Sequence, residues 1–281
     1  MSQKSYDGRN ALYLIPTPIG NLEDITLRAI NTLKKVDIIF CEDTRIAGML
    51  LNKLEIKKKL ISCNNINEDQ VKQKVLLELQ KGLNVGLITD RGTPIISDPG
   101  YKSVEFVINN GYNVIGLPGP TALIPALITS GIEPSPFLFY GFLNSKTTKM
   151  EKEVEELKSF KYTIIFYESP HRILNTLDVL KRIMGDRKIS VNREISKLYE
   201  EIYRGKISEV LNEMPNDIKG EFVIIVEGNK ELIDYNDISI KEHIIAYVKL
   251  GYSEKEAMKL VARDRKTSKS VIYKEYLRGS D

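Results

Sequence analysis

The chain has 281 residues, roughly twice the length of one typical domain, so two domains are the first expectation. Its formal net charge is only +3, which excludes a histone-like polycation and an acidic solvating tail but not a local basic patch. The hydrophobic share of 42% and the charged share of 28% are ordinary for a soluble globular protein.

Cysteine and histidine are both scarce in this sequence. The two cysteines, Cys41 and Cys63, form no CxxC pair, so we expect neither a disulfide framework nor a zinc site, and two histidines do not suffice for a histidine metal centre. The polar first ten residues lack the apolar stretch of a signal peptide, and no apolar run approaches the ~20 residues that span a bilayer. We therefore expect a reduced cytoplasmic protein with no metal and no membrane association.

Short apolar segments alternate with helical patterns, which predicts an α/β fold with a largely parallel sheet. In the first part of the chain, strands are expected at residues 11–15, 37–41, 85–89 and 113–117, and helices at residues 27–33, 71–79 and around 104–107. After a Pro/Gly-rich stretch, a second series has strands expected at residues 137–140, 163–167, 189–191 and 222–226, and helices at 147–157 and 173–184. We therefore expect two α/β domains, residues 1–119 and 120–232.

The pattern changes from about residue 229. Residues 234–239 have the composition of a polar linker, and residues 240–277 have the pattern of two or three short helices. Residues 252–278 contain eight Lys or Arg against four Asp or Glu. This predicts a small basic helical domain at residues 233–281, which either contacts RNA or serves as a solvated face or a dimer brace.

Four loops follow the predicted strands of the first domain, where open α/β sheets bind ligands. In the loop TPIGN, Gly20 permits a close backbone approach, although a simple turn explains it as well. The next loop, EDTR, either binds a ligand or pairs its own charges at a helix N-terminus. No GxGxxG motif follows the first strand, so a nicotinamide-binding fingerprint is absent.

The loop TDRGTPIISDPG at residues 89–100 has two glycines and two prolines, which is typical of a loop that shapes a site. Asp90 there is suited to a ribose hydroxyl or a cation, and Gly92 to presenting its N–H group; a rigid turn is the alternative. The loop LPGPTA at residues 117–122 either starts a helix beside a ligand or forms a plain hinge.

Three charged segments lie at the ends of predicted strands in the second domain. His171, in FYESPHR, is an acid–base candidate or a helix cap. Residues 193–201, REISKLYEE, either meet a substrate or form a solvated turn, and residues 219–222, KGEF, form a turn that leads into a strand.

Taken in order, these segments resemble the tetrapyrrole-methylase-like class of S-adenosylmethionine methyltransferases, and within it the branch that methylates 16S rRNA. The resemblance spans roughly residues 11–228, and the helical tail is also similar; the segments that carry it are TPIGNLEDITLRA, EDTR, GTPIISDPG, LPGPTA, GFL-S-K, FYESPHRI, REISKLYEEIYRG and KGEFV. It implies two α/β domains with S-adenosylmethionine in the cleft between them, in a homodimer. The implied reaction is 2'-O-methylation of a cytidine ribose in the decoding region of 16S rRNA within the 30S subunit.

The resemblance also implies which residues form the site. The cofactor would be bound by Pro18, Gly20, Asp90, Gly92, Thr93, Pro118, Gly119, Thr121 and Ala122 and, from the second domain, by Tyr167 and Glu168. Methyl transfer to a ribose hydroxyl requires alignment and removal of the hydroxyl proton, without a metal. Charge, loop position and motif give the catalytic candidates Glu168, Arg193, Glu194 and Lys197, with Asp43 and Arg45 from the first domain.

Three sites depart from the family pattern. Arg91 stands where a small residue is usual, and Asn144 where a proline is usual. Asn64 and Ile66 occupy places where histidines are common, so a mechanism with a histidine base there is not available to this chain.

Three other functions stay open. One is a small-molecule methylase of the corrin or diphthine type, and another is a 30S assembly factor that keeps the cofactor cleft without turnover. The third is a phosphohydrolase with Asp43, Asp90 and Asp98 around Mg²⁺. The basic tail and the segments of the rRNA branch favour the rRNA methylase.

Overall fold

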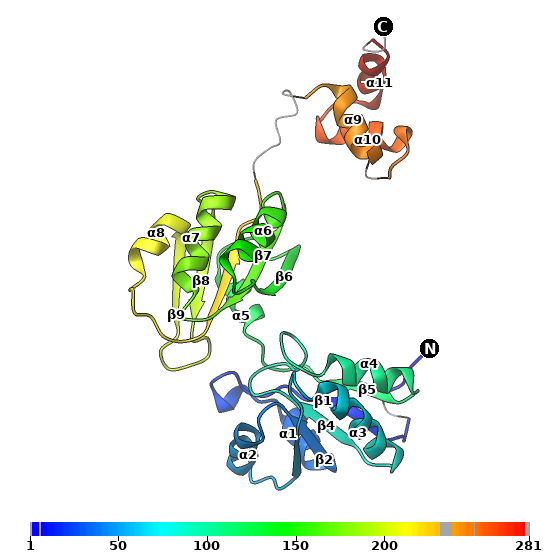
Figure 1. Ribbon diagram of the computed structural model, residues 1–281, viewed down its shortest axis with the longest axis vertical. Coiled ribbons are helices and arrows are strands. Elements are labelled where there is room, and N and C mark those ends of the chain that lie inside the picture. Colours follow the sequence, from blue (N-terminus) through cyan, green and yellow to red (C-terminus); the bar gives the residue numbers. More distant parts are fainter. Residues whose placement is uncertain (1, 6, 231–237, 250, 279–281) are drawn as a thin grey trace. The chain divides into compact units, whose positions relative to one another are not determined.

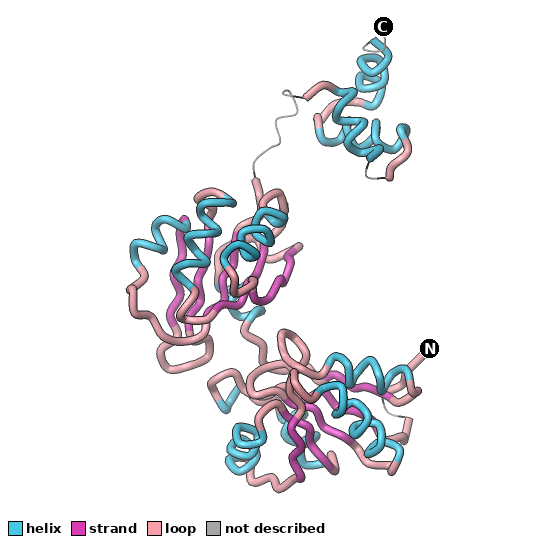
Figure 2. The backbone as a smooth tube through the Cα atoms, viewed as in Figure 1, coloured by secondary structure: helices cyan, strands magenta, loops and turns pink. Residues whose placement is uncertain are grey.

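The computed structural model describes residues 2–5, 7–230, 238–249 and 251–278. The chain divides into two compact units, Met1–Asn229 and Lys230–Asp281. The first unit contains two sheets, and the second, where described, contains only helices and loops (Figures 1 and 2). Most of the polar linker predicted at residues 234–239 lies outside the described residues.

The first sheet has five parallel strands in the order β3-β2-β4-β1-β5. They are β1 (Ala11–Leu14), β2 (Ile38–Cys41), β3 (Lys59–Ser62), β4 (Val85–Ile88) and β5 (Asn113–Gly116). Four of them confirm the predicted strands. The edge strand β3 was not expected from the sequence, because its four residues are at most half-buried and carry a weak apolar pattern.

Side chains of the first sheet alternate between two apolar layers. Ile39 packs in one layer with helices α1 (Leu27–Lys35) and α2 (Thr44–Lys53). Its neighbour Phe40 packs in the other with α3 (Glu68–Gln80) and α4 (Tyr101–Asn109). Helices α1, α3 and α4 confirm predictions, whereas α2 was not among the expected helices.

The carboxyl edge between β1 and β4 is the topological switch point of this sheet. These two strands are neighbours, but the chain runs from β1 toward β2 on one side and from β4 toward β5 on the other. Loops that leave adjacent strands in opposite directions open a crevice between them, which is where such sheets bind ligands.

The second sheet is mixed, in the order β6-β7-β10-β8-β9. Only β6 and β7 are parallel; the other neighbours are antiparallel, so the expectation of a largely parallel sheet is wrong for this half. The strands are β6 (Phe137–Phe142), β7 (Thr163–Glu168), β8 (Lys188–Arg193), β9 (Glu201–Lys206) and β10 (Phe222–Val226). Strand β9 was not expected, because its segment reads as a charged turn; a short connection suffices for the antiparallel pair that it forms with β8.

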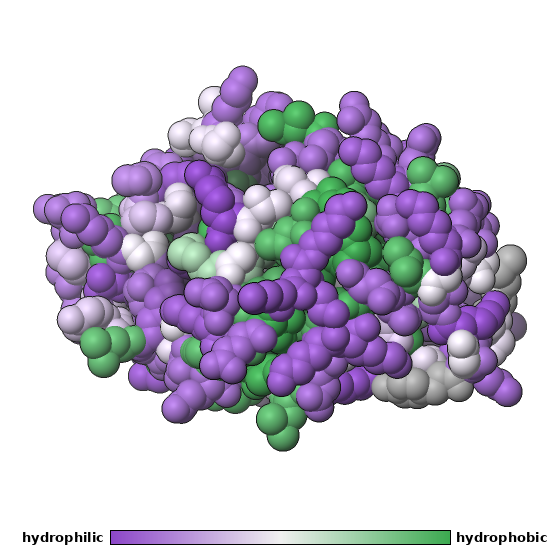
Figure 3. Space-filling view, turned by 90° about the horizontal axis from the view of Figure 1, so that it is seen from below, coloured by the Kyte–Doolittle hydropathy of each residue, from purple (hydrophilic) through white to green (hydrophobic). Residues whose placement is uncertain are grey.

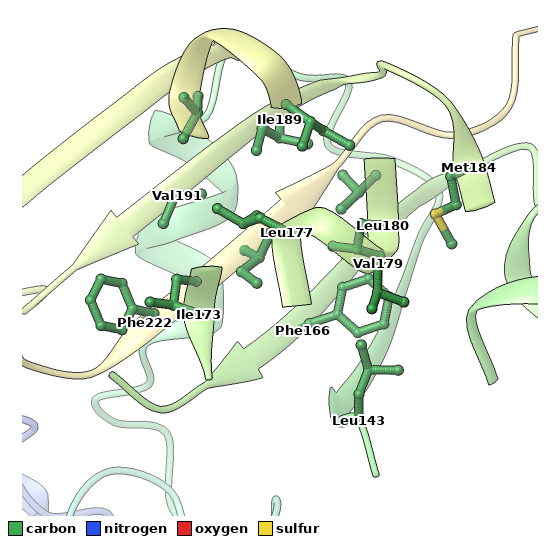
Figure 4. Packing of buried hydrophobic residues seen from close by; sticks show 14 of the residues in the cluster. Leu143, Phe166, Ile173, Leu177, Val179, Leu180, Met184, Ile189, Val191 and Phe222 are labelled. Atoms are coloured by element: carbon green, nitrogen blue, oxygen red, sulfur yellow. The ribbon is translucent and has the colours of Figure 1, made fainter. Parts of the chain in front are cut away.

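Helices cover both faces of the second sheet. On one face, Ile173, Leu177 and Leu180 of α7 pack over the sheet near Phe166 and Phe222 (Figure 4). The helices are α5 (Leu123–Thr129), which covers part of the other face, α6 (Thr147–Leu157), α7 (Ile173–Met184) and α8 (Ile207–Glu213). Helices α6 and α7 match the predicted bounds, because each carries a strong apolar stripe.

The second unit packs three short helices around its own small core, which confirms the two or three helices predicted there. They are α9 (Ile240–Lys249), α10 (Glu254–Asp264) and α11 (Lys269–Arg278). Ile244, Val261 and Ile272 are buried between them. A capping box of Ser253 and Glu256 begins α10, as its sequence SEKE suggests.

The surface mixes hydrophilic and hydrophobic areas. On the face shown in Figure 3, hydrophobic atoms gather in a strip near the middle, between hydrophilic areas. None of the helices that the structure describes is both long and apolar enough to cross a bilayer.

Candidate active site

The loops after β1 and β4 meet at the switch point. The N–H group of Thr17 donates to the carbonyl of Gly92 at 2.9 Å, and the N–H group of Gly92 donates back to the carbonyl of Thr17 at 3.0 Å. Gly92 has a φ of +82°, and a Cβ there would lie 3.2 Å from Ile19 Cγ2. Both facts favour glycine at this position. The two backbone hydrogen bonds join the loops after β1 and β4 into one wall.

Carboxylates gather along this wall. Thr89 Oγ1 donates to Glu42 Oε2 at 3.1 Å, and the Asp43 N–H group donates to Asp90 Oδ1 at 3.1 Å. Burial raises the pKa of Asp98 to about 6, the charges of Glu42 and Asp90 add to the rise, and a hydrogen bond from Thr89 opposes it. Burial likewise raises the pKa of Asp90. Half-buried carboxylates at such close quarters suit a cationic ligand.

The segment between β5 and α5 lies against the same wall. A Cβ at Gly119 would lie 2.5 Å from Pro16 Cβ, so this close approach requires glycine. Thr93 Oγ1 donates to the carbonyl of Pro120 at 2.9 Å. The segment that leads into the second half is therefore tied to the loops of the first.

Tyr167 supplies an aromatic wall from the end of β7. Its ring packs edge-on against Phe139 and Phe142, with centroid distances of 4.9 and 5.7 Å. Burial raises the pKa of Tyr167, while hydrogen bonds with the Thr121 side chain and the Leu123 backbone oppose that rise. The tyrosine thus links the second sheet to the connecting segment.

A group of four charged residues, which we call the Lys197 cluster, faces the acidic wall: Arg91, Glu194, Lys197 and Glu221. Lys197 Nζ lies 2.8 Å from both Glu194 Oε1 and Glu221 Oε2, and Arg91 Nη1 lies 2.5 Å from Glu221 Oε1. Burial acts to raise the pKa of Glu221, but hydrogen bonds from Lys197 and Arg91 outweigh it and hold that pKa below its ordinary value.

These walls enclose a cavity of about 660 Å³, which is in the size range of small-molecule sites. Asp90 and Asp98 line it from the first half, and Tyr167 and Lys197 from the second. An adjoining cavity of about 550 Å³ shares Ile19 and other residues with it. Within the described part of the chain, no group of three or more His, Cys, Asp or Glu residues is placed to hold a metal ion.

Most residues expected to bind the cofactor lie at these cavities. The larger cavity is lined by Asp90, Gly92, Thr93, Thr121, Ala122, Tyr167 and Glu168, and Gly119 lines the smaller one. Pro18, Gly20 and Pro118 line neither cavity. A Cβ at Gly20 would lie 2.3 Å from Lys197 Cγ, so this glycine makes room for the lysine stem.

The side chain of Glu168 is turned into the protein. Only 1% of its surface is exposed, and its Oε1 accepts the Ser169 N–H group at 2.7 Å. Its Oε2 accepts the Thr176 hydroxyl at 2.7 Å and lies 3.4 Å from Arg172. Both carboxylate oxygens are therefore engaged in holding the start of α7.

Four catalytic candidates line neither cavity: Glu194, which lies behind Lys197, and Arg193, Asp43 and Arg45. Arg193 donates to the Lys219 carbonyl at 2.6 Å and to Glu201 Oε2 at 3.0 Å. Asp43 and Arg45 form an ion pair at the start of α2, and the hydrogen bonds of Arg45 hold the pKa of Asp43 at about 2. The structure thus brings Lys197 to the cavity with Glu194 beside it, but does not bring Arg193, Asp43 or Arg45 there.

The sequence analysis assigned no site role to Glu221 and no cofactor role to Glu42 or Asp98, all of which line the larger cavity. The ends of the strands in the second sheet carry a signal that could have identified Glu221. Phe222 pairs with Glu168 on one side and with Arg193 on the other, so the segments FYE, RE and GEF all meet at one edge of the second sheet.

Known proteins share both the sequence and the fold of this chain. A family model described as Tetrapyrrole (Corrin/Porphyrin) Methylases matches residues 11–211. A protein of Bacillus subtilis (strain 168) named ribosomal RNA small subunit methyltransferase I is 46% identical over 98% of this chain and 97% of its own length. The chain belongs to the ribosomal RNA small subunit methyltransferase I family. This confirms the resemblance seen in the sequence.

Other members of the methyltransferase I family extend the match. The protein of that name from Halalkalibacterium halodurans is 43% identical over 98% of both chains, and that from Rickettsia prowazekii is 40% identical over 94% of this chain and 95% of its own. Because these matches cover nearly the whole chain, they include the second, helical unit.

Solved structures confirm the tetrapyrrole-methylase fold of this family member. Uroporphyrin-III C-methyltransferase from Thermus thermophilus, crystallised with S-adenosylhomocysteine, is 18% identical with a TM-score of 0.56, covering 77% of this chain and 97% of that one. The methyltransferase CobJ is 15% identical with a TM-score of 0.59, covering 78% and 94%.

Proposed function

We propose that this chain is an S-adenosylmethionine-dependent rRNA methyltransferase that methylates the 2'-hydroxyl of a cytidine in the decoding region of 16S rRNA. Its substrate is the assembled 30S subunit. The observation that carries the proposal is the near-full-length identity of 37–46% to proteins named ribosomal RNA small subunit methyltransferase I. A ribosomal substrate also agrees with the cytoplasmic location expected from the sequence.

The larger cavity has the chemistry that the cofactor requires. S-adenosylmethionine supplies an electrophilic methyl group on a positively charged sulfonium. Glu42, Asp90 and Asp98 place negative charge along one wall of the cavity, and Tyr167 adds an apolar ring on the other side. Gly92, with a φ of +82° and a lining position, presents its backbone to this cavity.

The Lys197 cluster has the chemistry that the ribose hydroxyl requires. A hydroxyl is a weak acid, so its oxygen needs a nearby positive charge as its proton leaves. Lys197 lines the cavity and is fixed by two carboxylates, which keep its ammonium group in one place. We assign it to stabilising the oxygen while that oxygen forms the new bond to the methyl carbon and the sulfur–methyl bond breaks.

The proton of the hydroxyl then passes to a carboxylate of the same cluster. Glu194 lies directly behind Lys197, with its Oε1 2.8 Å from Lys197 Nζ, and this contact with the cavity-lining lysine makes Glu194 our choice as acceptor. Glu168 is less suited, because both of its oxygens are occupied at the start of α7. We assign Glu168 to ordering that helix, and Arg193, Asp43 and Arg45 to supporting the loops around the site.

The experiment uses purified full-length chain, S-adenosylmethionine with a labelled methyl group, and three acceptors. The acceptors are 30S subunits that lack the modification, protein-free 16S rRNA, and uroporphyrinogen III. Methylated rRNA is digested to nucleosides and separated by mass, which distinguishes 2'-O-methylcytidine from base methylation.

We expect label in 2'-O-methylcytidine from 30S subunits and little from the other two acceptors. Label in a base instead of a ribose would overturn the 2'-O assignment. Label in uroporphyrinogen alone would make the chain a small-molecule methylase. Cofactor binding without transfer to any acceptor would favour the assembly factor.

A further inference from the structure

An ion pair joins the two α/β halves at the larger cavity. Arg91 follows β4 in the first half and Glu221 precedes β10 in the second, 130 residues further along the chain. The exposed shares of the two side chains are 52% and 60%. Pairs as exposed as this add little to stability, so stability alone does not account for its place at the site.

The same carboxylate also holds Lys197. Glu221 uses Oε1 for Arg91 and Oε2 for Lys197 Nζ, at 2.5 and 2.8 Å. The Glu221 N–H group donates to Glu194 Oε1 at 3.0 Å, and this oxygen also accepts from Lys197. Arg91 therefore acts on the lysine through one carboxylate that is shared between them.

The backbone is shaped to allow this arrangement. A Cβ at Gly20 would lie 2.3 Å from Lys197 Cγ, and a Cβ at Gly220 would lie 2.7 Å from Glu194 Cγ. Glu194 and Ser196 have φ values of +53° and +68°, a conformation that costs energy for residues other than glycine. Gly20 thus makes room for Lys197 and Gly220 for Glu194, while two strained residues flank the lysine in the chain.

We propose that Arg91 and Glu221 are positioning residues that hold Lys197 at the reacting hydroxyl. This inference rests on the proposed function. Arg91, from the first half, fixes Glu221, and Glu221 fixes the ammonium group of Lys197 in the second half. Without Arg91, the carboxylate and the lysine lose their common orientation, although the cofactor wall stays intact.

The test compares Arg91→Met, Arg91→Lys and Glu221→Gln with a matched control, Arg182→Met. Arg182 forms a similar exposed ion pair with Glu151, away from the cavity, with 55% of its side chain exposed. Three quantities are measured: the single-turnover rate on 30S subunits, the Kd of S-adenosylmethionine by calorimetry, and the rate at which an N-hydroxysuccinimide ester acetylates Lys197, followed by mass spectrometry.

We expect Arg91→Met to lower the single-turnover rate by about 10–100-fold, because small misplacements of a reacting group have effects of this size. The Kd of the cofactor should stay within about threefold of wild type, Arg91→Lys should recover part of the rate, and Arg182→Met should resemble wild type. Lys197 should be acetylated faster in Arg91→Met and in Glu221→Gln. In a Lys197→Met background, Arg91→Met should cause no further loss.

The inference is overturned if Lys197 is acetylated at the wild-type rate in Arg91→Met. It is also overturned if Arg91→Met lowers the rate by the same factor in the Lys197→Met background, since Arg91 would then act independently, for example on the RNA. If the wild-type chain transfers no methyl group to 30S subunits, the proposed function fails. The acetylation rates still decide whether Arg91 and Glu221 position Lys197.

Discussion

At the scale of single residues, Lys197 is the side chain that the structure places best for the chemistry. It lines the larger cavity, its stem passes over Gly20, and its ammonium group lies between Glu194 and Glu221. Its place depends on residues from both halves. The sequence suggested a role for it from charge and motif, but not these contacts.

We expect Lys197→Met to lower the single-turnover rate at least about 100-fold, a typical size for loss of one group that stabilises a developing oxyanion. Glu194→Gln should have a smaller but clear effect, because it removes the proton acceptor. The Kd of the cofactor should change little in both. Lys102→Met is the control, since Lys102 pairs with Asp69 on the surface. A wild-type rate in Lys197→Met would refute the assignment.

Asp98 is a second residue whose environment indicates ligand binding. Its pKa of about 6, against the ordinary 3.8, means that burial disfavours its charged form in the folded protein. At neutral pH the Asp98 carboxyl group is nevertheless ionised. Its charge therefore lowers the stability of the folded protein until a bound cation offsets it. Such a group in a cavity wall is typical of a binding site.

The folded protein holds the proton of Asp98 more tightly than the unfolded chain, so stability should fall as pH rises from about 4 to about 6. Asp98→Asn should remove that loss and be more stable than wild type at pH 7.5, by at most about 3 kcal/mol and by less where solvent screens the charge. Urea unfolding between pH 4 and 8 measures this, and the difference should shrink toward pH 4. A constant difference would contradict the assignment.

At the scale of elements, strong local patterns predicted the sheets and helices well. Helices α6 and α7 match their predicted bounds because apolar residues recur at helical spacing, and eight of the ten strands lie at expected segments. Strands β3 and β9 did not follow from the sequence. Both lie at sheet edges, where one side of the strand has no neighbour and the residues need less apolar character.

The start of α7 depends on a buried carboxylate. We expect Glu168→Ala to lower the free energy of unfolding by about 1–3 kcal/mol, because it leaves the buried Thr176 hydroxyl without its carboxylate acceptor and removes the ion-pair partner of Arg172. The melting temperature should fall by a few degrees per kcal/mol. Below that temperature, the rate per folded molecule should be near wild type. An unchanged melting temperature with a collapsed rate would instead make Glu168 the proton acceptor.

At the scale of the whole molecule, the chain combines a catalytic unit with a small basic one. The second unit has its own core, and Lys255, Lys259, Arg263, Lys266 and Lys274 are exposed on it. Exposed cations bind RNA by releasing counterions, so their effect depends on salt. The homodimer expected from the resemblance stays a prediction, which light scattering of the purified chain can test.

We expect replacement of Lys255, Lys259 and Arg263 by Gln to weaken binding to 30S subunits. The slope of log affinity against log salt should become shallower by about 2, since each phosphate contact contributes about 0.7–0.9. The Kd of S-adenosylmethionine should not change. The control replaces Lys149, Lys152 and Lys158 of the first unit by Gln, so that both variants have the same net charge. An unchanged salt slope would leave the second unit as a solvated face or a brace.

The sequence by itself determined the local elements, the carboxyl-edge loops and the family, because periodicity, caps and ordered motifs are local properties of the chain. Only the tertiary structure decided which charges form the site. Arg91 and Glu221 are 130 residues apart, and Glu168, a catalytic candidate from its motif, turns inward to Thr176. The modest net charge did not indicate which charged residues pair at the site. Ion pairs between the two halves depend on how the loops of the halves meet, and no local sequence pattern encodes that.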